Sequence, residues 1–231
     1  MSSPDPRHRS PHPVPEDRGG VLGFVRRHIW AVAIAVGLVV TTGMRPFTIR
    51  RPPVPEVLFQ VPNEFALVDQ DGRAFTPDDL RGKAWVVGFI FTRCPSVCPR
   101  VSQVMKAIAD DIHHGNLTDR VNVLSVSVDP EHDTPAVLKD YADRLGADPV
   151  HWRFVTGSPE QIERFVVDGF HLAVGDRQQT APGVYDIAHA TRLALVDQQG
   201  GVRVLFPTED GNRAELFNQI LGVVRLAHDG D

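Results

Sequence analysis

The stretch Ala84-Trp-Val-Val-Gly-Phe-Ile-Phe91 (AWVVGFIF) is followed at once by Thr92-Arg-Cys94-Pro-Ser-Val-Cys98-Pro99. The first part is a continuous apolar run, which predicts a strand buried on both faces of a sheet. Pro99 suits the first turn of a helix. We therefore predict a strand, a cysteine-containing loop and a helix. The loop would lie at the carboxyl-terminal edge of the sheet, where open α/β folds usually place their sites.

Strands and helices alternate after this point. Apolar residues at helical spacing run from Val101 to Ile112, and the β-branched run from Val121 to Val128 predicts a second central strand. The other expected elements are a hairpin within 65–76, a helix capped by Thr134, a strand at 152–155, a helix opening with the capping box Ser158-Pro-Glu-Gln161, a hairpin of 191–196 with 202–206, and a last helix at 216–227. This order predicts an α/β fold, a thioredoxin-like sandwich with an N-terminal hairpin.

The composition excludes several classes of protein. With 42% hydrophobic and 23% charged residues among 231, the chain is neither disordered throughout nor collagen-like. The net charge of −5 argues against binding to nucleic acid phosphates. Cys94 and Cys98 are the only cysteines, so at most one internal disulfide can form and a disulfide-stapled small fold is excluded.

An uncharged stretch precedes the predicted domain. The 17 residues from His28 to Met44 contain no Asp, Glu, Lys or Arg, which predicts a single transmembrane helix of about 25 Å. A buried core helix and a cleaved signal peptide stay open as alternatives. Five arginines precede the stretch and three follow it closely, which favours a cytoplasmic N-terminus. The main domain would then be periplasmic at the bacterial inner membrane, with the mitochondrial inner membrane as the alternative.

These patterns divide the chain into four parts. We expect a disordered cytoplasmic tail at 1–27, the transmembrane helix at 28–44, a proline-rich spacer at 45–60 and one thioredoxin-like domain at 61–231. The domain has about 170 residues, enough for one hydrophobic core and too few for two.

The cysteine pair carries the candidate chemistry. Amide groups at the start of a helix favour a thiolate, so Cys94 and Cys98 could exchange with a disulfide, reduce a peroxide or bind a soft metal ion. A purely stabilising disulfide would close a very short loop and remove little unfolded-state entropy. Two thiolates can hold Cu(I), and an imidazole as third ligand makes a trigonal site. We expect such a site to be exposed, because the ion has to be handed on.

His189 occupies a distinctive position among the histidines. It precedes the expected strand at 191–196, where thioredoxins usually have a cis-proline that faces the cysteines. The other histidines of the domain lie at expected helix ends, polar loops, strand edges or the chain end: His113, His114, His132, His151, His171 and His228. Position alone leaves open whether His189 is a third ligand or an ordinary residue at a strand edge.

Three segments together resemble one known family. They are Cys94-Pro-Ser-Val-Cys98-Pro99 behind an apolar strand, the segment SVDPEHDTP at 127–135, and His189 ahead of LALVD at 193–197. In this order, behind an N-terminal anchor, they resemble the SCO/SenC family of membrane-anchored copper chaperones for cytochrome c oxidase assembly. The resemblance covers roughly residues 65–226.

The resemblance implies a thioredoxin-like fold with Cys94, Cys98 and His189 as ligands of copper, as Cu(I) and also as Cu(II). It implies metallation of the binuclear copper centre of the oxidase, by copper delivery, by reduction of that centre's cysteines, or both. Its partners would be the copper-bearing oxidase subunit and other periplasmic copper chaperones or thiol reductases. Two features depart from the family pattern: Ala190 stands where Ser or Thr is frequent, and the segment at 174–185 is short. Asp129-Pro130 either lies near the ligands or only forms a turn.

Two other functions stay open. A membrane-tethered thiol-disulfide oxidoreductase or thiol peroxidase would cycle Cys94 and Cys98 between dithiol and disulfide, and would be an enzyme, which a metallochaperone is not. A non-catalytic interaction domain would keep the pair as a disulfide. Loss of the His189 imidazole separates the oxidoreductase from the copper chaperone. Copper binding should weaken severely, whereas thiol exchange should persist because it does not need that ring.

Overall fold

The computed structural model describes residues 28–48, 54–94, 98–172, 174–181, 184–189, 192–208 and 212–226, with only the backbone for 43–48, 174–181 and 184–189. The chain divides into two units, Met1–Arg51 and Pro52–Asp231. The first contains the helix α2 (Ile29–Thr48), which covers the predicted uncharged stretch. Within the described residues, no helix is both long and apolar enough to cross a membrane, so the predicted transmembrane helix is not found there.

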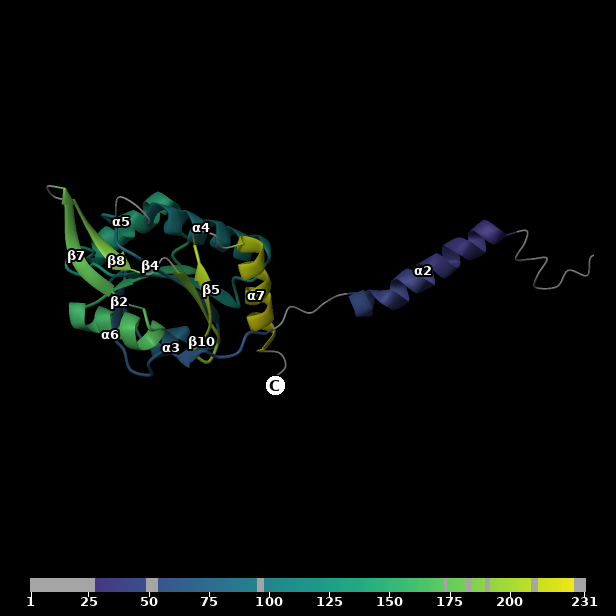
Figure 1. Ribbon diagram of the computed structural model, residues 1–231, viewed down its shortest axis with the longest axis horizontal. Coiled ribbons are helices and arrows are strands. Elements are labelled where there is room, and N and C mark those ends of the chain that lie inside the picture. Colours follow the sequence, from purple (N-terminus) through teal and green to yellow (C-terminus); the bar gives the residue numbers. More distant parts are fainter. Residues whose placement is uncertain are drawn as a thin grey trace, which may run out of the picture. The chain divides into compact units, whose positions relative to one another are not determined.

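The second unit alternates strands and helices (Figure 1). Its strands are β1 (Phe59–Gln60), β2 (Leu67–Asp69), β3 (Ala74–Phe75), β4 (Ala84–Ile90), β5 (Val121–Ser127), β6 (Trp152–Thr156), β7 (Val174–Ala181), β8 (Val184–His189), β9 (Arg192–Val196) and β10 (Gly201–Pro207). Its helices are α3 (Pro77–Leu80), α4 (Cys98–His114), α5 (Pro135–Leu145), α6 (Pro159–Phe170) and α7 (Arg213–Leu226).

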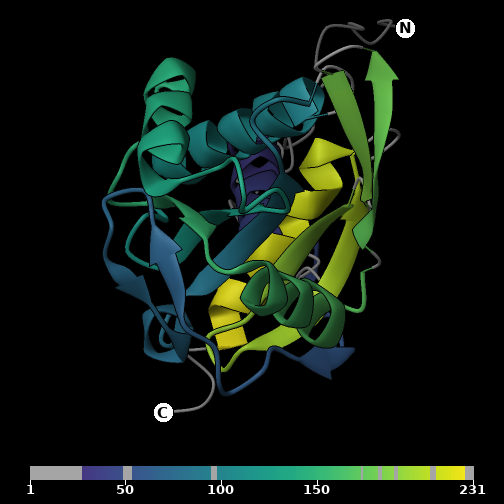
Figure 2. The ribbon, with the colours of Figure 1, turned by 90° about the vertical axis from the view of Figure 1, so that its left-hand side faces the viewer.

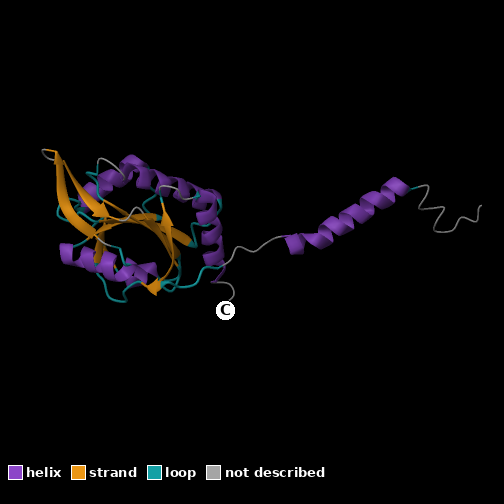
Figure 3. Cartoon of the chain, viewed as in Figure 1, coloured by secondary structure: helices purple, strands orange, loops and turns teal. Residues whose placement is uncertain are grey.

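One mixed sheet organises this unit. Among the described residues, eight strands form it in the order β1-β10-β9-β4-β5-β6-β2-β3, and β7 with β8 forms a separate hairpin. β4, β5 and β6 run parallel, and β9 runs antiparallel to β4. α4 and α5 cover one face and α6 the other, as Figure 2 and Figure 3 also show. The predicted α/β sandwich is therefore confirmed, with its N-terminal hairpin of β2 and β3.

The central strand β4 fixes the position of the cysteine helix. All seven residues of β4 are buried, as its apolar run predicts. Gly88 lets α4 approach closely, since a Cβ at this position would lie 2.1 Å from Met105 Sδ. On the opposite face Phe89 packs edge-on against Phe170 of α6, with ring centroids 5.1 Å apart. The helix that begins at Cys98 is thereby held against the middle of the sheet.

Two elements differ from the sequence predictions. The hairpin β7–β8 lies where the polar sequence of 175–180 shows no apolar alternation, so no strand is predicted there. β1 falls within the segment predicted as a spacer at 45–60. Leu58 N donates to Val202 O at 2.8 Å, and Arg203 Nη1 donates to Pro55 O at 2.7 Å. The end of that segment is therefore part of the sheet.

Replacing Gly88 by alanine should destabilise the domain by about 1–3 kcal/mol, because the added Cβ overlaps Met105 Sδ. Chemical denaturation followed by circular dichroism would show a lower midpoint at an unchanged slope. A Gly88→Ala, Met105→Ala double variant should be more stable than the sum of the two single losses predicts. Strictly additive losses would show that the two groups do not compete for one space.

Candidate functional site

Both cysteines lie where the central strand ends. β4 stops at Ile90, the backbone turns so that Cys94 N donates to Phe91 O at 3.2 Å, and α4 begins at Cys98. Residues 95–97 between the cysteines lie outside the described residues. The predicted strand, loop and helix thus occur in the expected order, with the loop at the carboxyl-terminal edge of β4.

The two cysteines lie close together and are not joined in a disulfide. Cys98 N, at the start of α4, donates to Cys94 Sγ at 3.3 Å. An amide donor at a helix start stabilises negative charge on the sulfur, which favours thiolate chemistry. Cys94 is 7% exposed and Cys98 is 1% exposed, so the expectation of exposed ligands is wrong for these two residues.

A buried carboxylate holds the residue two positions before Cys94. Asp133 is fully buried and accepts from Thr92 N at 3.1 Å, from Thr92 Oγ1 at 2.6 Å and from Ser127 Oγ at 2.6 Å. Ser127 and Asp133 both lie in the segment 127–135 that carries the family resemblance, but the sequence analysis assigned no role to Asp133.

Arg93, the residue directly before Cys94, forms an ion pair with a second buried carboxylate. Arg93 Nη2 lies 3.5 Å from Oδ2 of Asp129, which is also fully buried. The carbonyl of Asp129 accepts from His132 N and Asp133 N at 3.1 and 2.9 Å. Asp129 therefore forms the turn, and its side chain also contacts Arg93, the residue before Cys94.

Tyr141 of α5 lies beside the cysteine helix. Its hydroxyl is 2.8 Å from Ser102 Oγ of α4. Burial raises the pKa of the Tyr141 hydroxyl above its ordinary value. The hydrogen bond with Ser102 opposes this rise, and negative charge on Cys98 and Cys94 adds to it. The phenol is therefore near enough to the thiols to respond to their charge.

The backbone brings His189 toward the same edge of the sheet. β9 is antiparallel to β4, with Ala194 opposite Val87, so the start of β9 is directed to the carboxyl end of β4. His189 ends β8, three peptide units before Arg192, and these units span at most about 11 Å. The His189 side chain and residues 190–191 lie outside the described side chains. Among the side chains that are described, no group of three or more His, Cys, Asp or Glu could hold a metal ion.

A family model described as SCO1/SenC matches residues 57–225. The chain belongs to the SCO1/SenC family. The SCO1 protein homolog of Bacillus subtilis is 32% identical over 139 residues, which cover 60% of this chain and 69% of that protein. The chain spans about two thirds of the length of the curated relatives it matches.

Solved SCO structures share the fold. BsSco, described as having a disulfide switch and as a member of the Sco family of cytochrome c oxidase assembly proteins, is 26% identical, with a TM-score of 0.64 over 77% of this chain and 99% of that one. Bradyrhizobium japonicum ScoI, solved with copper bound, is 29% identical, with a TM-score of 0.54 over 72% of this chain and 98% of that one. The domain thus has the thioredoxin-like SCO fold, as predicted.

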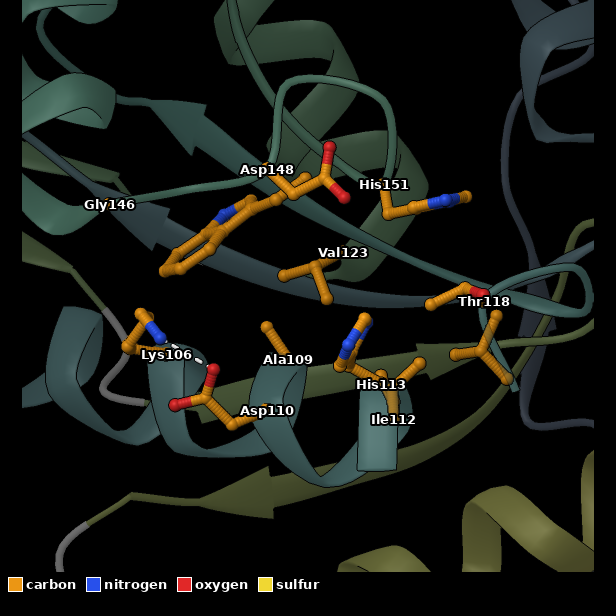
Figure 4. A pocket seen from close by; sticks show the side chains of 12 residues that line it. Lys106, Ala109, Asp110, Ile112, His113, Thr118, Val123, Gly146, Asp148 and His151 are labelled. Atoms are coloured by element: carbon orange, nitrogen blue, oxygen red, sulfur yellow. Dashed lines mark hydrogen bonds and ion pairs between the residues drawn. The ribbon is translucent and has the colours of Figure 1, made fainter. Parts of the chain in front are cut away.

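Two other described histidines of this SCO1/SenC domain lie elsewhere. His151 Nδ1 is 3.4 Å from Asn122 Oδ1. His113 lines a cavity of about 220 Å³, together with the ion pair of Lys106 and Asp110 (Figure 4). The cavity borders the amino ends of β5 and β6, so it lies at the sheet edge opposite the cysteines.

The burial of both thiols predicts slow alkylation in the native state. At pH 9, where exposed thiols are mostly ionised, iodoacetamide should modify Cys94 and Cys98 at least about tenfold more slowly in the folded, reduced chain than in guanidinium chloride. Mass spectrometry of timed samples measures both rates. Equal rates in the two conditions would contradict the burial of the two thiols.

Proposed function

We propose that this SCO1/SenC protein binds copper and serves the assembly of cytochrome c oxidase, with Cys94, Cys98 and His189 as ligands. The observation that carries the proposal is the hydrogen bond from the amide of Cys98, at the start of α4, to Cys94 Sγ, which places the two cysteines side by side without a disulfide between them. Support also comes from a relative solved with copper bound and from one assigned to oxidase assembly.

The donor set suits a monovalent copper cargo. Thiolates are soft ligands that select Cu(I), and two of them with one imidazole complete a trigonal site. Copper is a substrate to be passed on in this scheme, so transfer proceeds by ligand exchange with thiols of the binuclear copper centre in the oxidase subunit. Cu(II) would be held by the same three side chains.

A second role for the same pair is reduction of the oxidase cysteines. The contact between the two cysteines, which no disulfide joins in this structure, and the disulfide switch named for BsSco favour it. Cys94 and Cys98 would give two electrons and two protons to a disulfide of the target. A disulfide would form between them as the target becomes a dithiol.

We also propose that the chain is tethered at the bacterial inner membrane by residues 28–44, with the domain in the periplasm. The uncharged sequence and the excess of arginines on its amino side support this orientation. In α2, apolar side chains such as Trp30, at 81% exposed, and Val39, at 72% exposed, are open to the surroundings.

The reduced protein should bind close to one Cu(I) per chain in competition with a chromophoric chelator. Cys94→Ser and Cys98→Ser should each abolish this binding, because a single thiolate does not hold the ion against the chelator. Copper content after desalting, measured by atomic absorption, is an independent check. Full retention of copper by both variants would overturn the proposal.

Replacing His189 by alanine separates the copper site from a thiol oxidoreductase. Copper affinity should fall by more than about tenfold, since even partners that merely orient a ligand cost this much. Reduction of a model disulfide should stay within about twofold of the unaltered chain. His151→Ala is the matched control and should change neither quantity, because His151 lies at the other sheet edge. Unchanged affinity in His189→Ala would remove this residue from the ligand set.

Membrane tethering is tested by extraction. The full chain should stay with bacterial membranes in alkaline carbonate, whereas a variant without residues 1–44 should be released. Immunoblots of the two fractions give the result, with an established integral protein as the control. Release of the full chain would contradict the tether.

A further inference from the structure

The residues before Cys94 are fastened to the loop after β5. Asp133 contributes both carboxylate oxygens: Oδ1 accepts from Thr92 Oγ1, and Oδ2 accepts from Thr92 N and Ser127 Oγ. A carboxylate removed from water is costly unless donors replace the water, and three donors do so here. Asp133 thus links Thr92 to itself and to Ser127, which lie 41 and 35 residues further along the chain.

The helix after Cys98 is fastened at the corresponding point. Ser102 lies four residues after Cys98, so both face the same side of α4. Ser102 is 2% exposed, and its hydroxyl is 2.8 Å from that of Tyr141. The Tyr141 ring also packs edge-on against Phe154, at a centroid distance of 6.2 Å. The Arg144 guanidinium lies over the same ring, 5.7 Å from its centroid.

Both fastening residues belong to one continuous segment. Asp133 N donates to Asp129 O at 2.9 Å, and Thr134 accepts from Val137 N at 3.4 Å as the cap of α5. Tyr141 lies two turns further along the same helix. The segment therefore contacts the chain on both sides of the cysteine pair, at Thr92 before Cys94 and at Ser102 after Cys98.

We propose that Asp133 and Tyr141 are positioning residues for the cysteine pair. Through Thr92 and Ser102 they fix the two ends of the loop, and so set the distance between the Cys94 and Cys98 sulfur atoms. Neither residue is among the proposed ligands of the cargo. The copper readout below rests on the proposed function, whereas the thiol readout does not.

The first readout is the equilibrium of the reduced full chain with glutathione. Oxidised glutathione takes two electrons and two protons from Cys94 and Cys98, which form one disulfide, and leaves as two reduced molecules. The equilibrium constant measures how well the chain holds the two sulfur atoms together. It should fall at least about tenfold in Asp133→Asn and in Tyr141→Phe. Cu(I) affinity is the second readout, with an expected loss of about 10–100-fold.

Matched variants distinguish positioning from general loss of stability. Asp197 is another buried carboxylate, 1% exposed, which accepts from Gly201 N and Arg203 Nε at 2.7 Å each. It lies near the start of β4, away from the cysteines, so Asp197→Asn should lower the denaturation midpoint but leave the glutathione equilibrium within about twofold. Thr92→Val should reproduce the effect of Asp133→Asn, and Thr92→Ser, which keeps the hydroxyl, should not.

The outcomes decide the proposal even where one variant does not fold. If Asp133→Asn is unfolded by circular dichroism, Thr92→Val and Tyr141→Phe carry the test. Equilibrium constants in these variants that match the Asp197→Asn control would overturn the positioning role. If the unaltered chain binds no copper but the glutathione constants fall as expected, the proposed function fails and the positioning role stands.

Discussion

The burial of β4 on both faces is the constraint on which the site depends. Every side chain of this strand contacts protein, so the strand can offer reactive groups only beyond its carboxyl end. Because Gly88 has no side chain, Met105 of α4 packs directly against the strand, and this close approach positions α4. Cys94 therefore follows the strand, Cys98 opens the helix, and the amide of one meets the sulfur of the other. The packing of the sheet therefore determines where the two thiols lie.

Features that depend on nearby residues could be predicted from the sequence. The capping box of α6 occurs as expected: Gln161 N donates to Ser158 Oγ at 3.2 Å, and Ser158 N donates to Gln161 Oε1 at 2.8 Å. Thr134 caps α5. The apolar run of β4 and the helical spacing in α4 also gave correct elements, because each pattern reports which face of its own element is buried.

Features that join distant residues could not be predicted in this way. Asp133 meets Thr92 across 41 positions, and nothing in the neighbours of either residue specifies the partner. The local sequence pattern indicates only that Asp133 precedes Thr134, the cap of α5. The same holds for β1, whose two residues become a strand only because β10 offers an unpaired edge. The burial of the thiols likewise depends on the tertiary fold, whereas the expectation of exposure came from the needs of transfer.

This burial changes what transfer of the proposed cargo requires. A metal ion between two covered sulfur atoms is shielded from water and small thiols, so it is retained until an incoming ligand reaches it. Ligand exchange then requires Cys94 and Cys98 to become accessible while the contacts of Thr92 with Asp133 and of Ser102 with Tyr141 are kept. The spacing of the two sulfur atoms and access to them are therefore separate requirements. The first depends on residues packed beside the pair, and the second on a change that uncovers two buried side chains.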